Sequence, residues 1–223
     1  MQKRKIKDLL YEQVARVGKA VSSPKRLELL EVLVQGEKRV DALARDVGID
    51  IKLASSHLRV LKEARLVTSR RDGRFIAYRL SGDDVGALWV NLHMVAEEHL
   101  MELRAVLEKI IAAPERLTPE TRAGLLDKAR QGDILVLDVR PAVEYQAGHL
   151  PYARSIPIQE LELKLADLPQ DREIVAYCRG PFCLFAAEAV ALLHKKGFRA
   201  SKISDGIAEW SAAGMPLEGP PLA

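Results

Sequence analysis

The residues best suited to covalent chemistry are the two cysteines, Cys178 and Cys183, in the segment YCRGPFC at 177–183. A short apolar run typical of a buried strand precedes this segment, and apolar residues at helical spacing follow it from 184 to 196. A cysteine at a strand-to-helix turn has loop amides and a helix N-terminus directed at its sulfur, and both stabilise the reactive thiolate. We therefore expect Cys178 to be a reactive thiol that holds an anionic adduct such as a persulfide. The alternative is a buried, inert cysteine.

The second thiol, Cys183, lies at the far end of the same loop. Once Cys178 becomes a persulfide or sulfenic acid, Cys183 is placed to attack it and to close a disulfide or polysulfide bridge. A plain disulfide requires Cα atoms about 4.4–6.8 Å apart. The alternative role for Cys183 is packing under the following helix, and both interpretations stay open.

Composition bounds the class of protein. The chain has 223 residues, enough for two domains, and 29% of them are charged, an ordinary balance for a soluble protein. No apolar run approaches the ~18–20 residues that span a bilayer, and the N-terminus lacks the apolar region of a signal peptide. We therefore expect a cytoplasmic protein without a membrane partner. Two cysteines cannot form a disulfide framework or a four-thiolate zinc site, and we expect no cofactor and no metal.

The first half of the chain predicts a winged helix-turn-helix. Its apolar spacing indicates three helices and then a fourth, which Asp50 caps and whose buried side carries Leu53, Leu58 and Leu61. Two strands then flank Asp72-Gly73, which is a hairpin signal. Two short helices about a tight glycine turn form a helix-turn-helix, and the hairpin forms the wing. The first three predicted helices span 3–20, 24–36 and 40–47, and the strands span 66–70 and 75–80.

Positive charge coincides with this motif. The net charge is only +3, but the segment 52–79 holds eight Lys and Arg residues against two acidic ones. Short polar and basic side chains on the fourth helix suit the major groove, and arginines around the hairpin suit flanking phosphates or the minor groove. For His57, packing is the alternative to DNA contact. The predicted contacts with double-stranded DNA are Lys52, Ser55, Ser56, His57 and Arg59 on the helix and Arg70, Arg71 and Arg74 on the wing.

A long apolar stripe follows the wing. From Val85 to Ile111 the apolar residues keep one helical face for about seven turns. One small domain does not need so long a stripe, so we expect this helix to pair with a second copy of the chain in a homodimer. The alternative is a long core helix that contacts only its own chain.

The second half alternates strands and helices, which is typical of an α/β domain with a parallel sheet. Sites in such domains lie at the carboxyl ends of strands, where Cys178 is expected. The predicted elements are strands 134–138, 174–177 and 198–203 and helices 159–165, 184–196 and 206–213. The fold class is therefore α/β overall: a mainly α, dimerising winged helix-turn-helix domain over 1–112, a linker over 113–119, and an α/β domain with a parallel sheet over 120–223.

The runs SPKRLELL at 23–30, SSHLRVL at 55–61 and GRFIAYRL at 73–80 resemble the ArsR/SmtB repressors. The resemblance covers about residues 5–110 and implies a homodimer that leaves its operator DNA when an inducer binds. Members that sense arsenic or cadmium carry Cys-Val-Cys where this chain reads KRVD at 38–41, so a soft metal finds no thiolate. Zinc-sensing members use Asp and His pairs on the last helix. The nearest candidates here are Asn91, His93, Glu97 and His99, which lack the second pair, and a surface or dimer-contact role is preferred for them.

The runs LDVR at 137–140, GHLPYARSIP at 148–157 and DGIAEW at 205–210, with the cysteine loop, resemble the rhodanese (sulfurtransferase) domain over about 117–219. The resemblance implies that Cys178 accepts a sulfane sulfur and passes it on. A phosphatase of this fold requires an arginine at 184, where the chain has Leu184. Arg140 and Glu144 are expected to form a structural ion pair. The implied sulfur-binding loop is Arg179, Gly180, Pro181, Phe182 and Cys183, with the amides of all but Pro181 surrounding the sulfur.

The two halves together predict a dimeric, DNA-binding transcriptional repressor whose rhodanese domain senses or carries reactive sulfur, as a persulfide, on Cys178. The expected partners are operator DNA, a second copy of the chain, and a sulfur donor such as thiosulfate, polysulfide or a low-molecular-weight persulfide. The alternative is an active sulfurtransferase acting on thiosulfate or a persulfide, with the DNA-binding domain as its localiser.

Overall fold

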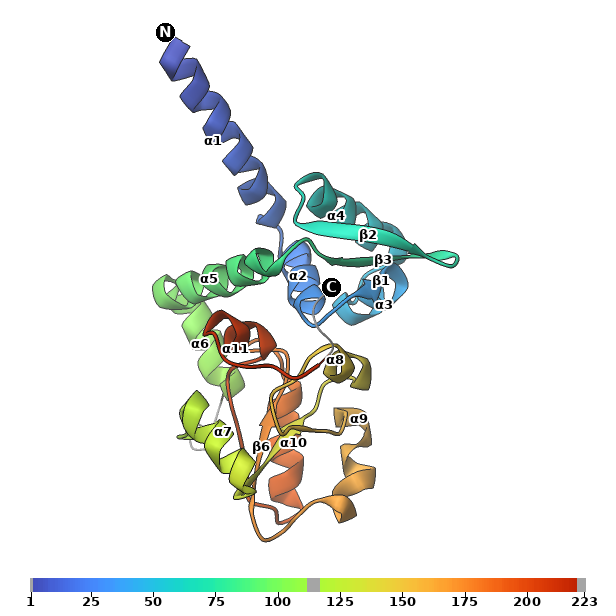
Figure 1. Cartoon of the computed structure of the whole chain (residues 1–223), viewed down its shortest axis with the longest axis vertical. Coiled ribbons are helices and arrows are strands. Elements are labelled where there is room, and N and C mark those ends of the chain that lie inside the picture. Colours follow the sequence, from blue (N-terminus) through green and yellow to red (C-terminus); the bar gives the residue numbers. More distant parts are fainter. Residues whose placement is uncertain (1, 112–116, 220–223) are drawn as a thin grey trace. The chain divides into compact units, whose positions relative to one another are not determined.

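The computed structural model describes residues 2–111 and 117–219. The chain forms two compact units, Met1–Trp89 and Val90–Ala223, whose elements are labelled in Figure 1. The predicted fold class is confirmed: a helical winged helix-turn-helix precedes an α/β domain with a parallel sheet. The predicted linker, 113–119, lies mostly outside the described residues. Within those residues, no helix combines the length and the apolar character needed to cross a membrane.

Four helices open the first unit, and local signals set their ends. Pro24 begins the second helix, where its missing N–H costs nothing, and Gly48 ends the third in the left-handed conformation, with φ 65°. Asp50 caps the fourth, its carboxylate accepting a hydrogen bond of 2.9 Å from the Leu53 amide. Figure 1 shows α1 extending away from the other elements of this unit. The helices are α1 (Gln2–Val21), α2 (Pro24–Val34), α3 (Val40–Val47) and α4 (Ile51–Glu63).

The wing is a three-stranded antiparallel sheet in the order β1-β3-β2. Its strands are β1 (Lys38–Arg39), β2 (Val67–Asp72) and β3 (Phe75–Leu80), of which the two-residue β1 was not predicted. Gly73 supplies the positive φ, 61°, that the hairpin turn needs.

The buried face of α4 differs from the predicted one at a single position. Leu58 and Leu61 are fully buried as expected, but Leu53 is 42% exposed and Ala54 is buried in its place. Ala54, Leu58 and Leu61 follow the i, i+4, i+7 spacing of one helical face, and Leu53 lies off that face.

The predicted continuous helix of 85–111 is wrong, because the structure has two helices there. They are α5 (Asp83–His99) and α6 (Met101–Ile111), separated at Leu100. The Arg104 guanidinium donates to the carbonyl oxygens of Glu97, at 2.7 Å, and Glu98, at 2.6 Å. A side chain therefore takes the place of the backbone donors that would have continued α5.

The second unit contains a parallel sheet in the order β5-β4-β6-β7. The predicted helix 159–165 is a short α-helix followed by a 3₁₀ turn, the strand of 198–203 shortens to three residues, and α7, α8 and β5 were not predicted. The strands are β4 (Ile134–Asp138), β5 (Arg154–Ser155), β6 (Glu173–Tyr177) and β7 (Ala200–Lys202). The helices are α7 (Arg122–Gln131), α8 (Ala142–Ala147), α9 (Ile158–Leu161), the 3₁₀ helix η2 (Glu162–Asp167), α10 (Phe185–Lys195) and α11 (Ile207–Ala212).

The alternation of side chains along β6 divides the core of this unit. Ile174 and Ala176 pack with α10, whereas Val175 and Tyr177 pack with Trp210 of α11 on the other face. Cys178 follows β6 and belongs to the α10 cluster. The strand therefore delivers the cysteine to its own carboxyl end, beside the start of α10.

Candidate functional site

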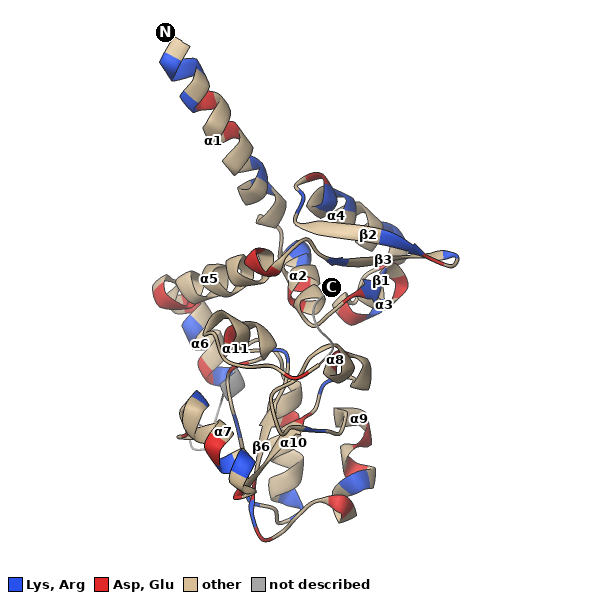
Figure 2. Cartoon of the chain, in the orientation of Figure 1, with Lys and Arg blue, Asp and Glu red and all other residues tan. Residues whose placement is uncertain are grey.

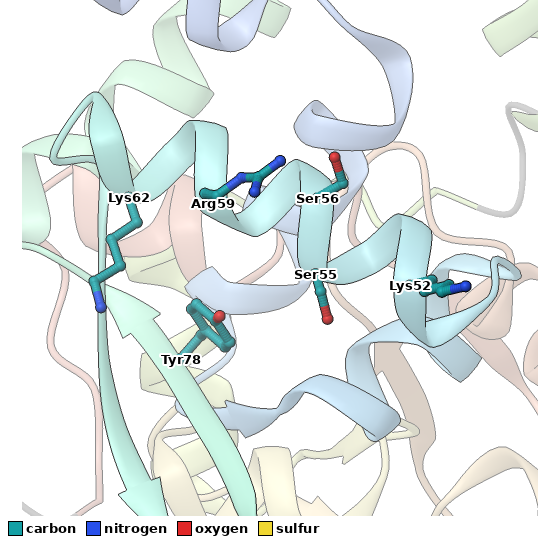
Figure 3. Close-up of a pocket in the computed structure, with 6 residues that line it drawn as sticks. All are labelled: Lys52, Ser55, Ser56, Arg59, Lys62 and Tyr78. Carbon is teal, nitrogen blue, oxygen red and sulfur yellow. The ribbon is translucent and has the colours of Figure 1, made fainter.

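The outer face of α4 lines a groove with a volume of about 400 Å³. Figure 3 shows Ser55 and Lys62 pointing to the side of α4 on which Tyr78 lies, with Ser56 and Arg59 on the other side. The structure thus brings together four of the five predicted helix residues, while His57 is half-buried and does not line the groove. The lining residues are Lys52, Ser55, Ser56, Arg59, Lys62 and Tyr78.

Two residues of this groove were missed from the sequence. Lys62 donates a hydrogen bond of 2.7 Å to the Ser69 hydroxyl of β2, and its spacing of three from Arg59 was the signal for a shared face. Tyr78 on β3 is only 8% exposed, and burial raises the pKa of its phenol. Its place on the wing sheet follows from the fold and not from any local pattern.

The three predicted wing arginines have different environments, although Arg70 and Arg71 lie on β2 and Arg74 lies in the turn that follows it. Figure 2 shows basic positions along this hairpin. Arg70 forms a bidentate pair with Glu37, at 2.5 Å to one carboxylate oxygen and 3.0 Å to the other, and that carboxylate raises the pKa of the guanidinium. Arg71 donates to the Gly73 carbonyl at 3.2 Å, and Arg74 lies over the Phe75 ring at 5.0 Å. Only Arg70 of the three must exchange a carboxylate partner before it neutralises a phosphate.

The cysteine loop holds two free thiols of unequal exposure. Cys178 is 3% exposed, and Cys183 is partly exposed. The Cys178 sulfur lies 3.4 Å from the Cys183 carbonyl oxygen and 3.9 Å from the Gly180 carbonyl oxygen. The amide of Cys183 donates to the Gly180 carbonyl at 3.1 Å, so this amide is not directed at the sulfur as predicted.

The pKa values of the two thiols are shifted in opposite directions. Burial, the largest cause, and the neighbouring Cys183 sulfur raise the pKa of Cys178 well above its usual value, against the amides of Ala186 and Gly180. A hydrogen bond from Cys178 lowers the pKa of Cys183, and the amides of Arg179 and Phe185 lower it further. The N-terminus of α10 therefore acts on both sulfurs, while burial disfavours the thiolate of Cys178 more than that of Cys183.

Two arginines behind the loop each form an ion pair with a buried carboxylate. Arg179 is bound bidentately by Glu144, at 2.6 and 3.0 Å, and Arg140 by Asp138, at 2.5 Å, with both Arg140 and Asp138 fully buried. Glu144, the partner predicted for Arg140, also helps to raise the pKa of that guanidinium.

Lys202 at the end of β7 was also missed from the sequence. Its side chain is buried, at 7% exposure, on the strand position that pairs with Ala176 of β6. Burial lowers the pKa of Lys202, and the charges of Cys178 and Cys183 act in the opposite direction. The ammonium group therefore supplies a buried positive charge toward the two sulfurs.

The residue that precedes α11, Gly206, packs directly against the backbone of the cysteine loop. A Cβ built on Gly206 would lie 2.0 Å from the Arg179 carbonyl oxygen, so no side chain fits there. The Glu209 carboxylate accepts a hydrogen bond of 2.7 Å from the Gly206 amide. A Cβ built on Gly180, whose φ is 150°, would lie 3.1 Å from the same carboxylate.

The residues considered for a metal do not converge on one. Among residues 2–111 and 117–219, no group of three or more His, Cys, Asp or Glu side chains is arranged to hold a metal ion. His93 contacts Glu97 and Glu209 with its two ring nitrogens, and His99 is exposed at the end of α5.

Comparison with known families matches both halves of the chain. Residues 23–69 match the model described as "Bacterial regulatory protein, arsR family", and residues 121–213 match the model of the rhodanese-like domain. The chain is 43% identical over 217 residues to the HTH-type transcriptional regulator Rv0324 of Mycobacterium tuberculosis, covering 97% of this chain and 95% of that one.

Two further relatives each match one half of the chain. The chain is 30% identical over 89 residues to a sulfurtransferase of Allochromatium vinosum, covering 40% of this chain and 81% of that protein. A solved homodimeric winged helix-turn-helix fragment, Mb0332 of Mycobacterium bovis, is 44% identical and covers 43% of this chain and 89% of its own, with a TM-score of 0.41.

Proposed function

The chain belongs to the ArsR family of bacterial transcriptional regulators and carries a rhodanese-like domain, and we propose that it is a dimeric repressor released from its operator when reactive sulfur loads the cysteine loop. The observation that carries the proposal is the pair of unequal thiols at the N-terminus of α10. A chain that both binds DNA and presents such a pair joins a signal receptor to a DNA-binding element.

We place the operator in the groove along α4. The exposed polar and basic side chains there suit base edges in the major groove, and the β2–β3 hairpin carries Arg71 and Arg74 toward the backbone. Arg70 contributes less to DNA binding, because in the free protein its charge is already paired with that of Glu37.

We propose that α1 packs against α1 of a second copy of the chain. Ile6, Leu9, Leu10, Tyr11 and Val14 are between 54% and 70% exposed, although they follow the spacing of one apolar face. Pairing α1 with its copy removes this surface from water and gives the two-fold symmetry that a palindromic operator requires. Apolar side chains are also exposed near the α5–α6 break, among them Met94, Val95 and Met101.

In our proposal Cys183 accepts the sulfur from the donor and then passes it to Cys178. The Cys183 thiolate attacks the outer sulfur of a low-molecular-weight persulfide, the sulfur–sulfur bond of the donor breaks, and the donor leaves as a thiolate. The Cys178 sulfur then attacks the outer sulfur on Cys183, its proton passes to the Cys183 sulfur, and the persulfide ends on Cys178. The amides of Gly180 and Ala186 and the Lys202 charge hold that anion.

Operator binding measured with reduced and persulfide-treated protein tests this function. We expect treated wild type to lose affinity about tenfold or more, the scale of typical coupling between two sites. Cys178→Ser and Cys183→Ser should each bind the operator as reduced wild type does and should not respond. An unchanged affinity after treatment, with loading verified by intact mass, refutes sensing.

A second candidate function, sulfur transfer as catalysis, is favoured by the partly exposed, low-pKa thiol of Cys183. The only cation within the loop itself, Arg179, is already paired with Glu144, which disfavours the thiosulfate dianion relative to a singly charged persulfide. Steady-state transfer from thiosulfate to cyanide therefore separates the two functions. Turnover that persists with operator DNA bound and leaves its affinity unchanged would favour the enzyme.

A further inference from the structure

His93 on α5 is a buried histidine that contacts the cysteine loop and its support. Its side chain is 4% exposed, and its ring meets the Phe182 ring edge-on, with centroids 5.5 Å apart and an interplanar angle of 64°. The Nε2 atom lies 2.9 Å from a Glu209 oxygen, and Nδ1 lies 3.1 Å from a Glu97 oxygen. All four residues belong to the second unit.

Two carboxylates on the ring nitrogens of His93 favour its imidazolium form. Burial lowers the pKa of His93, but the hydrogen bonds and charges of Glu209 and Glu97 outweigh it and raise the pKa above its usual 6.5. A protonated ring donates one hydrogen bond from each nitrogen, so each carboxylate receives a charge-assisted bond. Breaking one partner of such a buried set leaves an uncompensated charge, which makes the arrangement sensitive to small displacements.

Glu209 connects this cation to the loop backbone. One Glu209 oxygen accepts a hydrogen bond from His93, and the other accepts one from the Gly206 amide. Gly180 packs so closely against the same carboxylate that a Cβ there would lie 3.1 Å from it. Phe182, whose ring contacts His93, adjoins Cys183 in sequence. A sulfur atom added in this tightly packed loop therefore displaces a group that touches His93, because close-packed interiors do not absorb added volume.

We propose that His93 is the positioning residue through which the sulfur state of the cysteine loop reaches α5, and through that helix the DNA-binding unit. The proposal rests on the sensing function proposed above. The helix α5 begins at Asp83 in the first unit and ends at His99 in the second, so a displacement of His93 acts on an element that both units share. A packed contact with two arrangements, and not distance alone, carries the coupling.

Linkage adds a reciprocal requirement. If sulfur on the loop weakens operator binding by a given factor, operator DNA must weaken sulfur retention by the same factor. Both effects pass through His93 in this proposal. Loss of the residue should therefore abolish both while leaving DNA binding and sulfur loading intact as separate activities.

The test compares full-length wild type, His93→Gln and His99→Gln by the ratio of operator Kd for persulfide-loaded protein to that for reduced protein. His99 is a matched control because it is the same residue type on the same helix and is exposed. We expect a ratio of about ten or more in wild type and His99→Gln, and about one in His93→Gln, within the usual range of coupling. The reduced Kd of His93→Gln should stay within about twofold of wild type, which a merely structural loss would not allow.

Glu97→Gln keeps the proposal falsifiable should His93→Gln fail to fold. This side chain is 32% exposed and supplies one of the two carboxylates on His93, so its variant should show a ratio between one and the wild-type value. A wild-type ratio in folded His93→Gln, or in Glu97→Gln where the former does not fold, overturns the proposal. A ratio of one in wild type itself overturns the sensing function and the proposal with it, so the two failures are distinguishable.

Discussion

At the scale of single residues, the shared proton of the cysteine pair gives a testable asymmetry. The S–H of Cys178 stabilises the Cys183 thiolate and is the largest cause of its lowered pKa. Cys178→Ala removes that donor, so the pKa of Cys183 should rise, and each unit of rise lowers the thiolate fraction at neutral pH about tenfold. The pH–rate profile of Cys183 alkylation should therefore move to higher pH, as followed by peptide mass spectrometry.

The matched variant for this experiment is Cys178→Ser, whose hydroxyl remains a donor of similar size. It should keep the alkylation profile of Cys183 close to that of wild type. Identical profiles for the alanine and serine variants would contradict the proposed hydrogen bond.

Sequence reasoning located these residues but not their order of acidity. The strand-to-helix position of Cys178 followed from local periodicity, and so did the polar face of α4. The opposite pKa shifts of Cys178 and Cys183 depend on burial and on which amides near the start of α10 donate to which sulfur. The contact between His93 and Glu209 joins residues 116 positions apart, and no local pattern reports such a pair.

At the scale of elements, the close approach of α11 to the cysteine loop predicts a strict requirement for glycine at 206. In Gly206→Ala the new Cβ meets backbone and not a flexible side chain, so α11 must shift. We expect a loss of about 1–3 kcal/mol in unfolding free energy, the usual cost of overpacking, and altered alkylation of Cys183. Thermal and denaturant unfolding measure the first effect.

Gly18→Ala is the control for this substitution. No atom lies within 4 Å of a Cβ at Gly18, in the interior of α1, so the change should be neutral or stabilising by up to about 1 kcal/mol. Equal stability of Gly206→Ala and wild type would show that the loop tolerates displacement, and would weaken the argument that added sulfur moves Glu209.

Elements with strong local signals were predicted well, and elements that depend on distant partners were not. The capped helix α4 and the Asp72-Gly73 hairpin carry their own signals, and both formed where expected. The two-residue strands β1 and β5 exist only through pairing with β3 and β4. At the break between α5 and α6, the Arg104 side chain binds the carbonyl oxygens at the end of α5. No proline or glycine marks this break in the sequence.

At the scale of the whole molecule, the salt dependence of operator binding should distinguish the wing arginines. Each phosphate contact contributes about 0.9 to the slope of log K against log salt concentration, so Arg71→Ala and Arg74→Ala should each reduce that slope by about one. Arg70→Ala should reduce it by less, because Arg70 must first leave Glu37. Fluorescence anisotropy over a series of KCl concentrations measures the three slopes, and an equal reduction for all three would contradict the distinction.

The passage of α5 from the first compact unit into the second has a practical consequence for anyone who isolates the amino-terminal half. A fragment ended at residue 112 retains His93 and Glu97 but discards Glu209 and Phe182, which hold the ring from the other side. Its imidazole then keeps Glu97 and loses Glu209 as a partner, and on the sensing function proposed above we expect persulfide to leave the operator affinity of the fragment unchanged.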